Sequence, residues 1–457
     1  MRALMWFRRD LRLADNPPLR MASSTGAVVP VFVIDPHLTG PSGAPRLSFL
    51  LRCLAALDES LGGHLVLRTG DPADQIPRLV SESDASVVFA TADFGPYGRD
   101  RDAVVASRLA RDRVAFELVE SSYLVPPGTV TKADGTPYRV FTPFFRAWQE
   151  HAHDVASGPP PDDLLLVGRI ASDPPPREPA VDAMLPRAGE AAGRERLAAF
   201  ATGGIHYTRD RDRPDCDATS RLSPYLKFGC IHPRQVVDSL RDDRNAEEVR
   251  RQLAWREFYA DVVYHEPRST RHALQEATGR IRVDRGADAD RRFDAWAAGR
   301  TGYPIVDAGM RQLAGEAWMH NRVRMIVASF LVKDLHLDWT WGARLFMQRL
   351  VDGDLASNSH GWQWVAGTGT DAAPYHRIFN PVRQGKRFDP NGDYVRRWIP
   401  ELAGIDGPAV HEPWTLRQEL AGYPAPIVDH AEQRREALSR YAAARANGGA
   451  APPPRRR

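Results

Sequence analysis

The stretch VVPVFVI at residues 28–34 decides how the first part of this chain folds. It is apolar throughout, so both of its faces must be buried, as is typical of a strand inside a parallel sheet. Four further runs are also largely apolar, and we predict that each forms a strand of the same kind. They lie at residues 3–6, 64–68, 86–90 and 114–119.

Helical patterns separate these runs. The leucines of residues 46–63 recur with the helix period, and Gly62 and Gly63 give that helix a C-terminal stop. Residues 71–83 and 99–112 predict two more helices. Alternating strands and helices predict an α/β domain over residues 1–130, built on an open, parallel, doubly wound sheet.

The rest of the chain has a different pattern. Proline-rich stretches at 157–163 and 172–179 cannot propagate a helix, so we expect residues 131–195 to be a long connecting linker. Helical periodicity dominates residues 196–445 and predicts a larger all-α domain. We expect the last residues, 446–457, to be a disordered tail.

The overall composition restricts the class of protein only weakly. A net charge of +3 over 457 residues does not by itself indicate nucleic-acid binding. Cys53, Cys216 and Cys230 are too few and too scattered for a disulfide framework or a zinc cluster. We find no membrane-spanning apolar run and no signal-peptide core, and therefore expect a cytoplasmic protein.

Glycine-rich nucleotide-binding motifs are missing from the predicted α/β domain, so the helical domain is the better place for a cofactor. Seven of the 11 tryptophans lie between residues 255 and 364. They suit either a tryptophan-rich core or a site that stacks flat rings and carries electrons between them.

Polar residues are concentrated in the same domain. The segment DGDLASNSHGWQW, residues 352–364, carries two acids, and Arg324 in a core needs one of them, Asp352 or Asp354, as a partner. Upstream, the segment 219–223 can either cap a helix or bind a phosphate with Arg221.

Several motifs together resemble one known family. They are FRRDLRLADN at 7–16, PYGRDRD at 96–102, TSRLSPYLKFG at 219–229, TGYPIVDAGMRQL at 301–313 and DGDLASN at 352–358. This set resembles the photolyase/cryptochrome family, specifically its class I DNA photolyases, over nearly the whole chain. The resemblance implies light-driven repair of cyclobutane pyrimidine dimers, by electron transfer from excited reduced FAD to a lesion flipped out of the DNA.

The resemblance also implies a cofactor site. Asn358 would face the flavin N5, Trp362 would donate an electron to the flavin, and Trp339 would be the next donor. The implied FAD contacts are Tyr207, Thr219, Ser220, Arg221, Leu222, Ser223, Trp318, Asn321, Arg324, Asp352, Asp354 and Asn358.

A lesion site follows from the same resemblance. Trp255 and Trp364 would sandwich the dimer, and Asn321 and Met325 stand where members that repair (6-4) photoproducts carry histidines, which favours the cyclobutane dimer. We expect a monomer that binds damaged single- or double-stranded DNA without reading its sequence. The implied lesion and DNA contacts are Arg211, Gln252, Trp255, Asn321, Arg322, Met325, Trp364 and Arg377, with Arg383, Lys386 and Arg387 as further basic candidates.

Three features depart from the family pattern. Gln252 replaces an acidic residue, and Ser359 and His360 add bulk near the flavin, where we expect His360 to titrate near neutral pH. The segment 279–293 lacks the usual distal tryptophan, whose place falls near Gly286. Trp296 and Trp341 are the candidates to substitute for it.

The α/β domain of this family often holds an antenna pigment. PYGRDRD resembles the members that bind 8-hydroxy-5-deazaflavin, with Arg46, Phe49 and Asp93 as candidate contacts. Methenyltetrahydrofolate or no antenna at all are the alternatives. The rival functions are a cryptochrome photoreceptor, against which Asn358 and the short tail argue, and (6-4) photoproduct repair.

Overall fold

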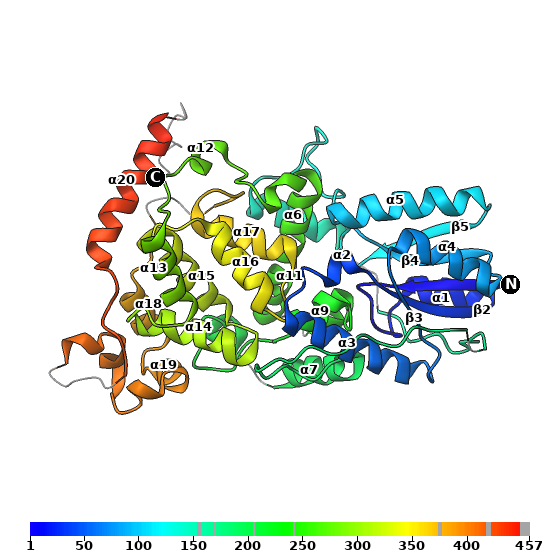
Figure 1. The fold of residues 1–457 in the computed structure, drawn as a ribbon, viewed down its shortest axis with the longest axis horizontal. Helices are drawn as coiled ribbons and strands as arrows, with labels where there is room; N and C mark the ends of the chain where they lie inside the picture. Colours follow the sequence, from blue (N-terminus) through cyan, green and yellow to red (C-terminus); the bar gives the residue numbers. More distant parts are fainter. Residues whose placement is uncertain are drawn as a thin grey trace.

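The structure, a computed structural model, describes residues 1–447 apart from 153–156, 169, 204–205, 241–242, 373–376 and 417–421. It consists of an α/β domain followed by a helical domain (Figure 1). Among the described residues, no helix is both long and apolar enough to cross a membrane. Most of the expected tail, 446–457, lies outside the described residues.

A five-stranded parallel sheet forms the centre of the α/β domain, as predicted. Its order is β3-β2-β1-β4-β5. The chain adds β2 and β3 on one side of β1, and then crosses to add β4 and β5 on the other side, so the switch in strand order lies between β1 and β4. The strands are β1 (Arg2–Phe7), β2 (Ala27–Ile34), β3 (Val66–Thr69), β4 (Val87–Ala92) and β5 (Ala115–Ser121).

Both faces of the central strands β1, β2 and β4 are covered, which explains why these strands are largely apolar, whereas the edge strand β5 is mostly exposed and carries Glu117 and Glu120. Met5 and Phe7 of β1 pack on the face that carries α1 (Pro17–Thr25) and α3 (Ala44–Ser60). Leu4 and Trp6 point the other way, toward α4 (Pro72–Ser83) and α5 (Pro96–Arg111). The short α2 (Pro36–Thr39) follows β2.

Within its described residues, the range expected to be a linker contains one complete helix. This is α6 (Phe141–His151), whose Phe144 and Trp148 pack against Phe258 of α11 (Arg244–His265). The linker therefore forms part of the helical core through aromatic residues, and α7 (Glu190–Thr202) begins before it ends.

The helical domain surrounds α17 (Leu355–Ala366), which packs against α11, α15 and α16. Its other elements are α8 (Tyr207–Asp210), α9 (Ser223–Phe228), α10 (Pro233–Asp238), the 3-10 turn η1 (Pro267–Thr270), α12 (Glu276–Gly279), α13 (Ala287–Ala297), α14 (Pro304–Glu316), α15 (Asn321–Ser329), the π-helical turn η2 (Phe330–Asp334), α16 (Trp339–Arg349), α18 (Pro381–Phe388), α19 (Asp393–Trp398), the 3-10 turns η3 (Pro400–Leu402), η4 (Gly407–His411) and η5 (Pro413–Thr415), and α20 (His430–Asn447).

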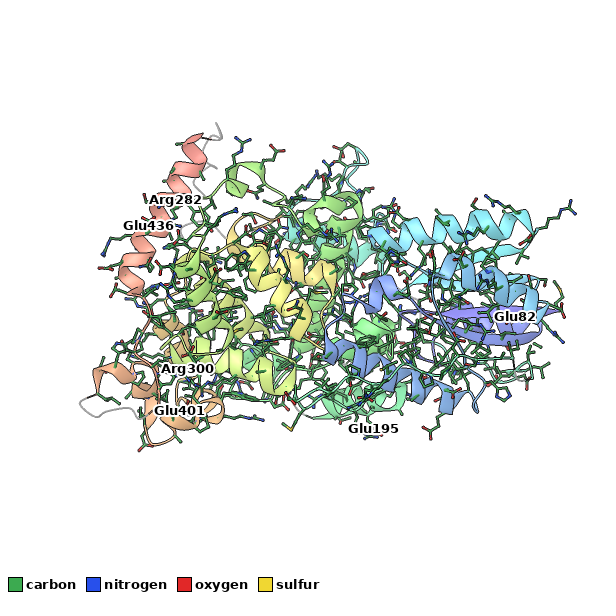
Figure 2. The ribbon with its side chains drawn as sticks, in the orientation of Figure 1. Glu82, Glu195, Arg282, Arg300, Glu401 and Glu436 are labelled. Carbon is green, nitrogen blue, oxygen red and sulfur yellow. The ribbon has the colours of Figure 1, made fainter. Side chains whose placement is uncertain are left out.

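Helix α20 closes the far end of the helical domain, opposite the sheet (Figure 1). Its Glu436 accepts a hydrogen bond of 2.7 Å from Arg282, and both residues are labelled in Figure 2. At the other end of the domain, Leu11 N donates to Phe228 O over 3.2 Å. The segment after β1 thus contacts the helical domain directly at α9.

Candidate functional site: a polar face of helix α17

Asp354 begins the polar face of α17. Its side chain caps the helix by accepting from Ser357 N over 3.1 Å, and it pairs with Arg9 Nη2 at 2.9 Å and Lys227 Nζ at 3.9 Å. Burial by itself raises the pKa of Asp354, but the charges of Arg9 and Lys227 outweigh it and hold the pKa well below its ordinary value. Asp354 therefore stays ionised.

Asp352 has a different partner. Arg324 Nη2 donates to Asp352 Oδ2 over 2.8 Å, and Arg324 Nε donates to Met319 O over 2.8 Å. Of the two candidate acids, Asp352 is thus the partner of Arg324, whereas Asp354 pairs with Arg9 and Lys227. Asp352 Oδ1 is buried and has no hydrogen-bond partner among the residues that the structure describes. This fixed carboxylate fits a cofactor that offers an N–H or O–H donor.

Asn358 lies one helical turn after Asp354, and Trp362 one turn after that, so the three share a face of α17. Asn358 Nδ2 donates to Ala343 O on α16 over 3.0 Å, which fixes the orientation of the carboxamide. A carboxylate, an amide and an indole thus lie in a row along one side of α17. They offer polar groups and a flat ring surface, which suit binding of a flat polar ring system.

Trp362 begins a chain of aromatic contacts. The indole is 3% exposed, and its ring centroid lies 6.1 Å from that of Trp296. Trp296 in turn lies 5.7 Å from Phe293, which lies 5.4 Å from Trp341. Trp296 is therefore the indole in ring contact with Trp362, and the role of Trp339 as the next donor stays a prediction.

The segment 219–223 lies beside Trp318. Arg221, at a left-handed φ of 50°, stacks 4.4 Å from the Trp318 ring and pairs with Asp217 and Glu316. Trp318 Nε1 donates to Ser223 Oγ over 3.3 Å. The guanidinium is therefore already held by two carboxylates, while Leu222 is buried and Asn321 is exposed at the start of α15.

The remaining predicted FAD contacts in this region are Thr219, Ser220 and Tyr207. The Thr219 and Ser220 carbonyls accept from Arg196 over 3.0 and 2.8 Å. Tyr207 packs edge-on against Phe200, and burial raises its pKa to about 12. Tyr207 is thus a neutral phenol in the physiological range.

On α11, Trp255 lies among the residues predicted to bind the lesion. It stacks on Phe141 with centroids 3.7 Å apart and an interplanar angle of 9°. Gln252, one turn earlier, donates from Nε2 to Glu248 Oε1 over 2.9 Å, and Glu248 also pairs with Arg211. The amide that replaces the expected acid is therefore coupled to a carboxylate next to it.

The other predicted DNA contacts are more dispersed. Arg322 pairs with Asp212 at 2.8 Å and lies over the Phe388 ring, while Trp364 and Met325 are half-buried against the helical core. The Arg377 side chain is exposed, and its carbonyl accepts from Lys333 over 2.8 Å. Helix α18 exposes the side chains of Arg383, Lys386 and Arg387, of which Lys386 pairs with Glu412.

His360 behaves differently from our expectation. It is 1% exposed, with Nε2 3.0 Å from Ser269 Oγ and its ring stacked on Tyr259, while the neighbouring Ser359 Oγ donates to Thr270 O. Burial lowers the pKa of His360 to about 4. The expected titration near neutral pH was wrong, because the ring packs into η1 instead of facing solvent.

The three antenna candidates have different contact partners. Phe49 is buried and packs against Phe228, with ring centroids 5.3 Å apart. Arg46 reaches the Met347 carbonyl on α16, and burial lowers its pKa to about 10. Asp93, after β4, pairs with Arg101 at 3.4 Å.

Lys227 is the residue that sequence reasoning missed in this region. Burial and the charge of Arg9 lower its pKa to about 7, against the opposite influence of Asp354. A lysine among the apolar residues of YLKFG was the available signal. It adds a cation between the carboxyl end of β1 and the polar face of α17.

Comparison with known proteins identifies these features. Residues 3–162 match the family model described as DNA photolyase, and residues 249–443 match the model of the FAD binding domain of DNA photolyase. The chain is 43% identical to a deoxyribodipyrimidine photo-lyase of Streptomyces griseus, over 94% of this chain and 97% of the relative. A counterpart from Halobacterium salinarum is 40% identical, over 97% and 99%.

Solved structures agree with this. A bacterial class III photolyase from Agrobacterium tumefaciens superimposes with a TM-score of 0.91 at 37% identity, covering 97% of this chain and 98% of that one. A cryptochrome from Synechocystis superimposes with 0.86 at 28% identity, covering 96% and 98%. The assignment to class I stays a prediction. Because one family model matches residues 3–162, another matches residues 249–443, and the relatives align over nearly the whole chain, this chain belongs to the DNA photolyase family.

Proposed function

We propose that this protein repairs cyclobutane pyrimidine dimers in DNA in a light-dependent reaction. The polar face of α17 and the nearby Asp352 carry the proposal. Neighbouring residues hold each of the four side chains in place, namely those of Asp352, Asp354, Asn358 and Trp362. FAD, when bound, would supply the light absorption and the electron that opens the dimer.

The residues of this face have separate roles in holding FAD. Asp352 accepts from the cofactor through its unused oxygen, while Arg324 holds that carboxylate and offsets negative charge on the flavin. Asn358 offers an uncharged amide oxygen toward N5. An aspartate at that position would oppose an anionic flavin. Tyr207 and the segment 219–223 would hold the phosphates of FAD.

The lesion would bind next to Trp255 on α11, with Trp364 on its other side. The Trp255–Phe141 stack fixes one indole as a flat apolar platform, suited to an extruded base. Asn321 and Met325 favour the cyclobutane dimer over the (6-4) photoproduct. Basic side chains around this region would position the phosphate backbone without reading sequence.

An antenna pigment would bind near the carboxyl ends of β1 and β4, where ligands of doubly wound sheets collect. Arg46 and Lys227 supply positive charge there that suits an anionic pigment such as 8-hydroxy-5-deazaflavin, whereas the Asp93 carboxylate is paired with Arg101. A neighbour from Sulfolobus tokodaii, 30% identical, is described as holding two FAD molecules. The pigment extracted from purified protein would identify the antenna.

The proposal is tested by repair of an oligonucleotide that contains one cyclobutane dimer, in blue light and in darkness. We expect repair in light only, and loss of repair without loss of FAD in Asn358→Asp. If FAD-loaded protein leaves the cyclobutane dimer intact in light, the proposal is overturned.

A further inference from the structure

Two buried cysteines face each other across the contact between the two domains. Cys53 on α3 and Cys230, just after α9, bring their Sγ atoms to 3.5 Å, although 177 residues separate them in the chain. Both are 0% exposed. We propose that they are a redox modification site, which a peroxide converts to a disulfide that joins the α/β domain to the helical domain.

The position of Cys230 is fixed by contacts with the segment after β1. Arg12 Nη1 donates to Gly229 O over 3.1 Å, and Leu11 N donates to Phe228 O. Gly229 adopts a φ of +67°, and a Cβ there would overlap the Arg9 carbonyl oxygen. The backbone that carries Cys230 therefore cannot move away from the α/β domain without breaking these contacts.

Cys53 is fixed from the other side. It lies one helical turn after Phe49, whose ring packs 5.3 Å from Phe228 and 5.9 Å from Tyr225. A disulfide needs its sulfur atoms about 2.05 Å apart, so the two Sγ atoms must approach by about 1.5 Å. Because the contacts above hold the backbone of Cys230, rotation of the two side chains about their Cα–Cβ bonds must supply this approach.

The oxidation balances with a peroxide as the oxidant. One thiol attacks the O–O bond, which gives a sulfenic acid and releases water or an alcohol. The second sulfur attacks the sulfenic sulfur: the S–S bond forms, the S–O bond breaks, and the thiol proton leaves with hydroxide as water. Each sulfur gives up one electron, and the peroxide takes both.

Burial makes this reaction slow and selective. It raises the pKa of Cys53, so little thiolate is present at neutral pH. Only a small uncharged oxidant enters, and only when the domain contact opens. Cys216, which is partly exposed, reacts independently of the pair.

Closing so long a loop removes chain entropy from the unfolded state, so the oxidised protein should melt on the order of 5 °C higher. The test uses FAD-loaded Cys216→Ser protein, treated with hydrogen peroxide, quenched, denatured in a thiol-blocking maleimide and digested. We expect the Cys53 and Cys230 peptides to be recovered as one linked species that dithiothreitol separates.

Cys230→Ala in the same background is the matched control, and should give neither the linked peptide nor the rise in melting temperature. The proposal is overturned if both thiols stay maleimide-reactive at a peroxide dose that consumes Cys216 in the parent protein. Oxidation of both sulfurs to sulfinic acids without a link, or a link without a rise in melting temperature, would also overturn it.

Discussion

Arg324 shows how a single ion pair can determine cofactor binding. Arg324→Leu leaves the Asp352 carboxylate, whose side chain is 3% exposed, without its partner, and breaking such a pair costs about 3 kcal/mol. We expect a lower free energy of unfolding and loss of most FAD, measured by urea denaturation and by flavin absorbance per chain. Arg282→Leu, which breaks the exposed pair with Glu436, should change neither quantity (Figure 2). Full FAD occupancy in Arg324→Leu would count against our site.

The burial of His360 predicts that the free energy of unfolding falls as the pH falls. Its pKa is about 4 in the folded protein and about 6.5 when unfolded, so between these values the unfolded state binds more protons. The stability that neutral His360 provides is complete above about pH 6.5 and is lost as the pH falls toward 4. At about pH 4 the loss approaches 3 kcal/mol.

His360→Asn should therefore flatten the fall in the free energy of unfolding between those pH values, measured by urea titration at each pH. Repair between about pH 7 and 8 should not depend on this side chain, because the imidazole stays neutral there. If the free energy of unfolding falls as steeply with decreasing pH in His360→Asn as in the wild type, the burial of His360 does not cause this pH dependence.

At the scale of elements, helices α13, α16 and α17 enclose the chain Trp362, Trp296, Phe293 and Trp341. Because Trp296 touches Trp362, Trp296→Phe should slow photoreduction of bound FAD by external thiol about tenfold or more, while Trp339→Phe should slow it less. The measurement is flavin bleaching in blue light. The reverse order of effects would restore Trp339 as the next donor.

Gly286 is not a simple place to add the missing tryptophan. Its φ of +87° disfavours any side chain, although no atom would meet a Cβ there within 4 Å. Trp341, half-buried on α16, is the better end of the chain, so Trp341→Phe is the informative variant.

The contact between α6 and α11 predicts how damaged DNA is recognised. Trp255→Ala removes the indole that stacks on Phe141 and should cost about 1–3 kcal/mol of affinity for dimer-containing DNA, with little effect on undamaged DNA. Titration of fluorescent oligonucleotides measures both, and affinity for each should fall as salt rises. Equal losses for damaged and undamaged DNA would contradict the role of Trp255 in lesion binding.

At the scale of the whole molecule, the sequence predicted the parallel sheet because its central strands β1, β2 and β4 are buried on both faces and are largely apolar. It also predicted the pairing of Arg324 with an acid, since both lie in recognisable motifs. It did not show that Asp354 pairs with Arg9, 345 residues away, nor that η1 buries His360. Those contacts depend on packing between distant segments, as does the approach of Cys53 to Cys230.

The central claim is dimer repair by a DNA photolyase whose lesion site carries Asn321, Met325 and Trp255. The most direct measurement places two oligonucleotides of identical sequence, one with a cyclobutane thymine dimer and one with a (6-4) photoproduct, in separate blue-light reactions with FAD-loaded protein. Intact thymines are then counted by chromatography of the products. We predict restored thymines from the cyclobutane dimer alone. Repair of the (6-4) photoproduct, or repair of neither lesion, would contradict the account.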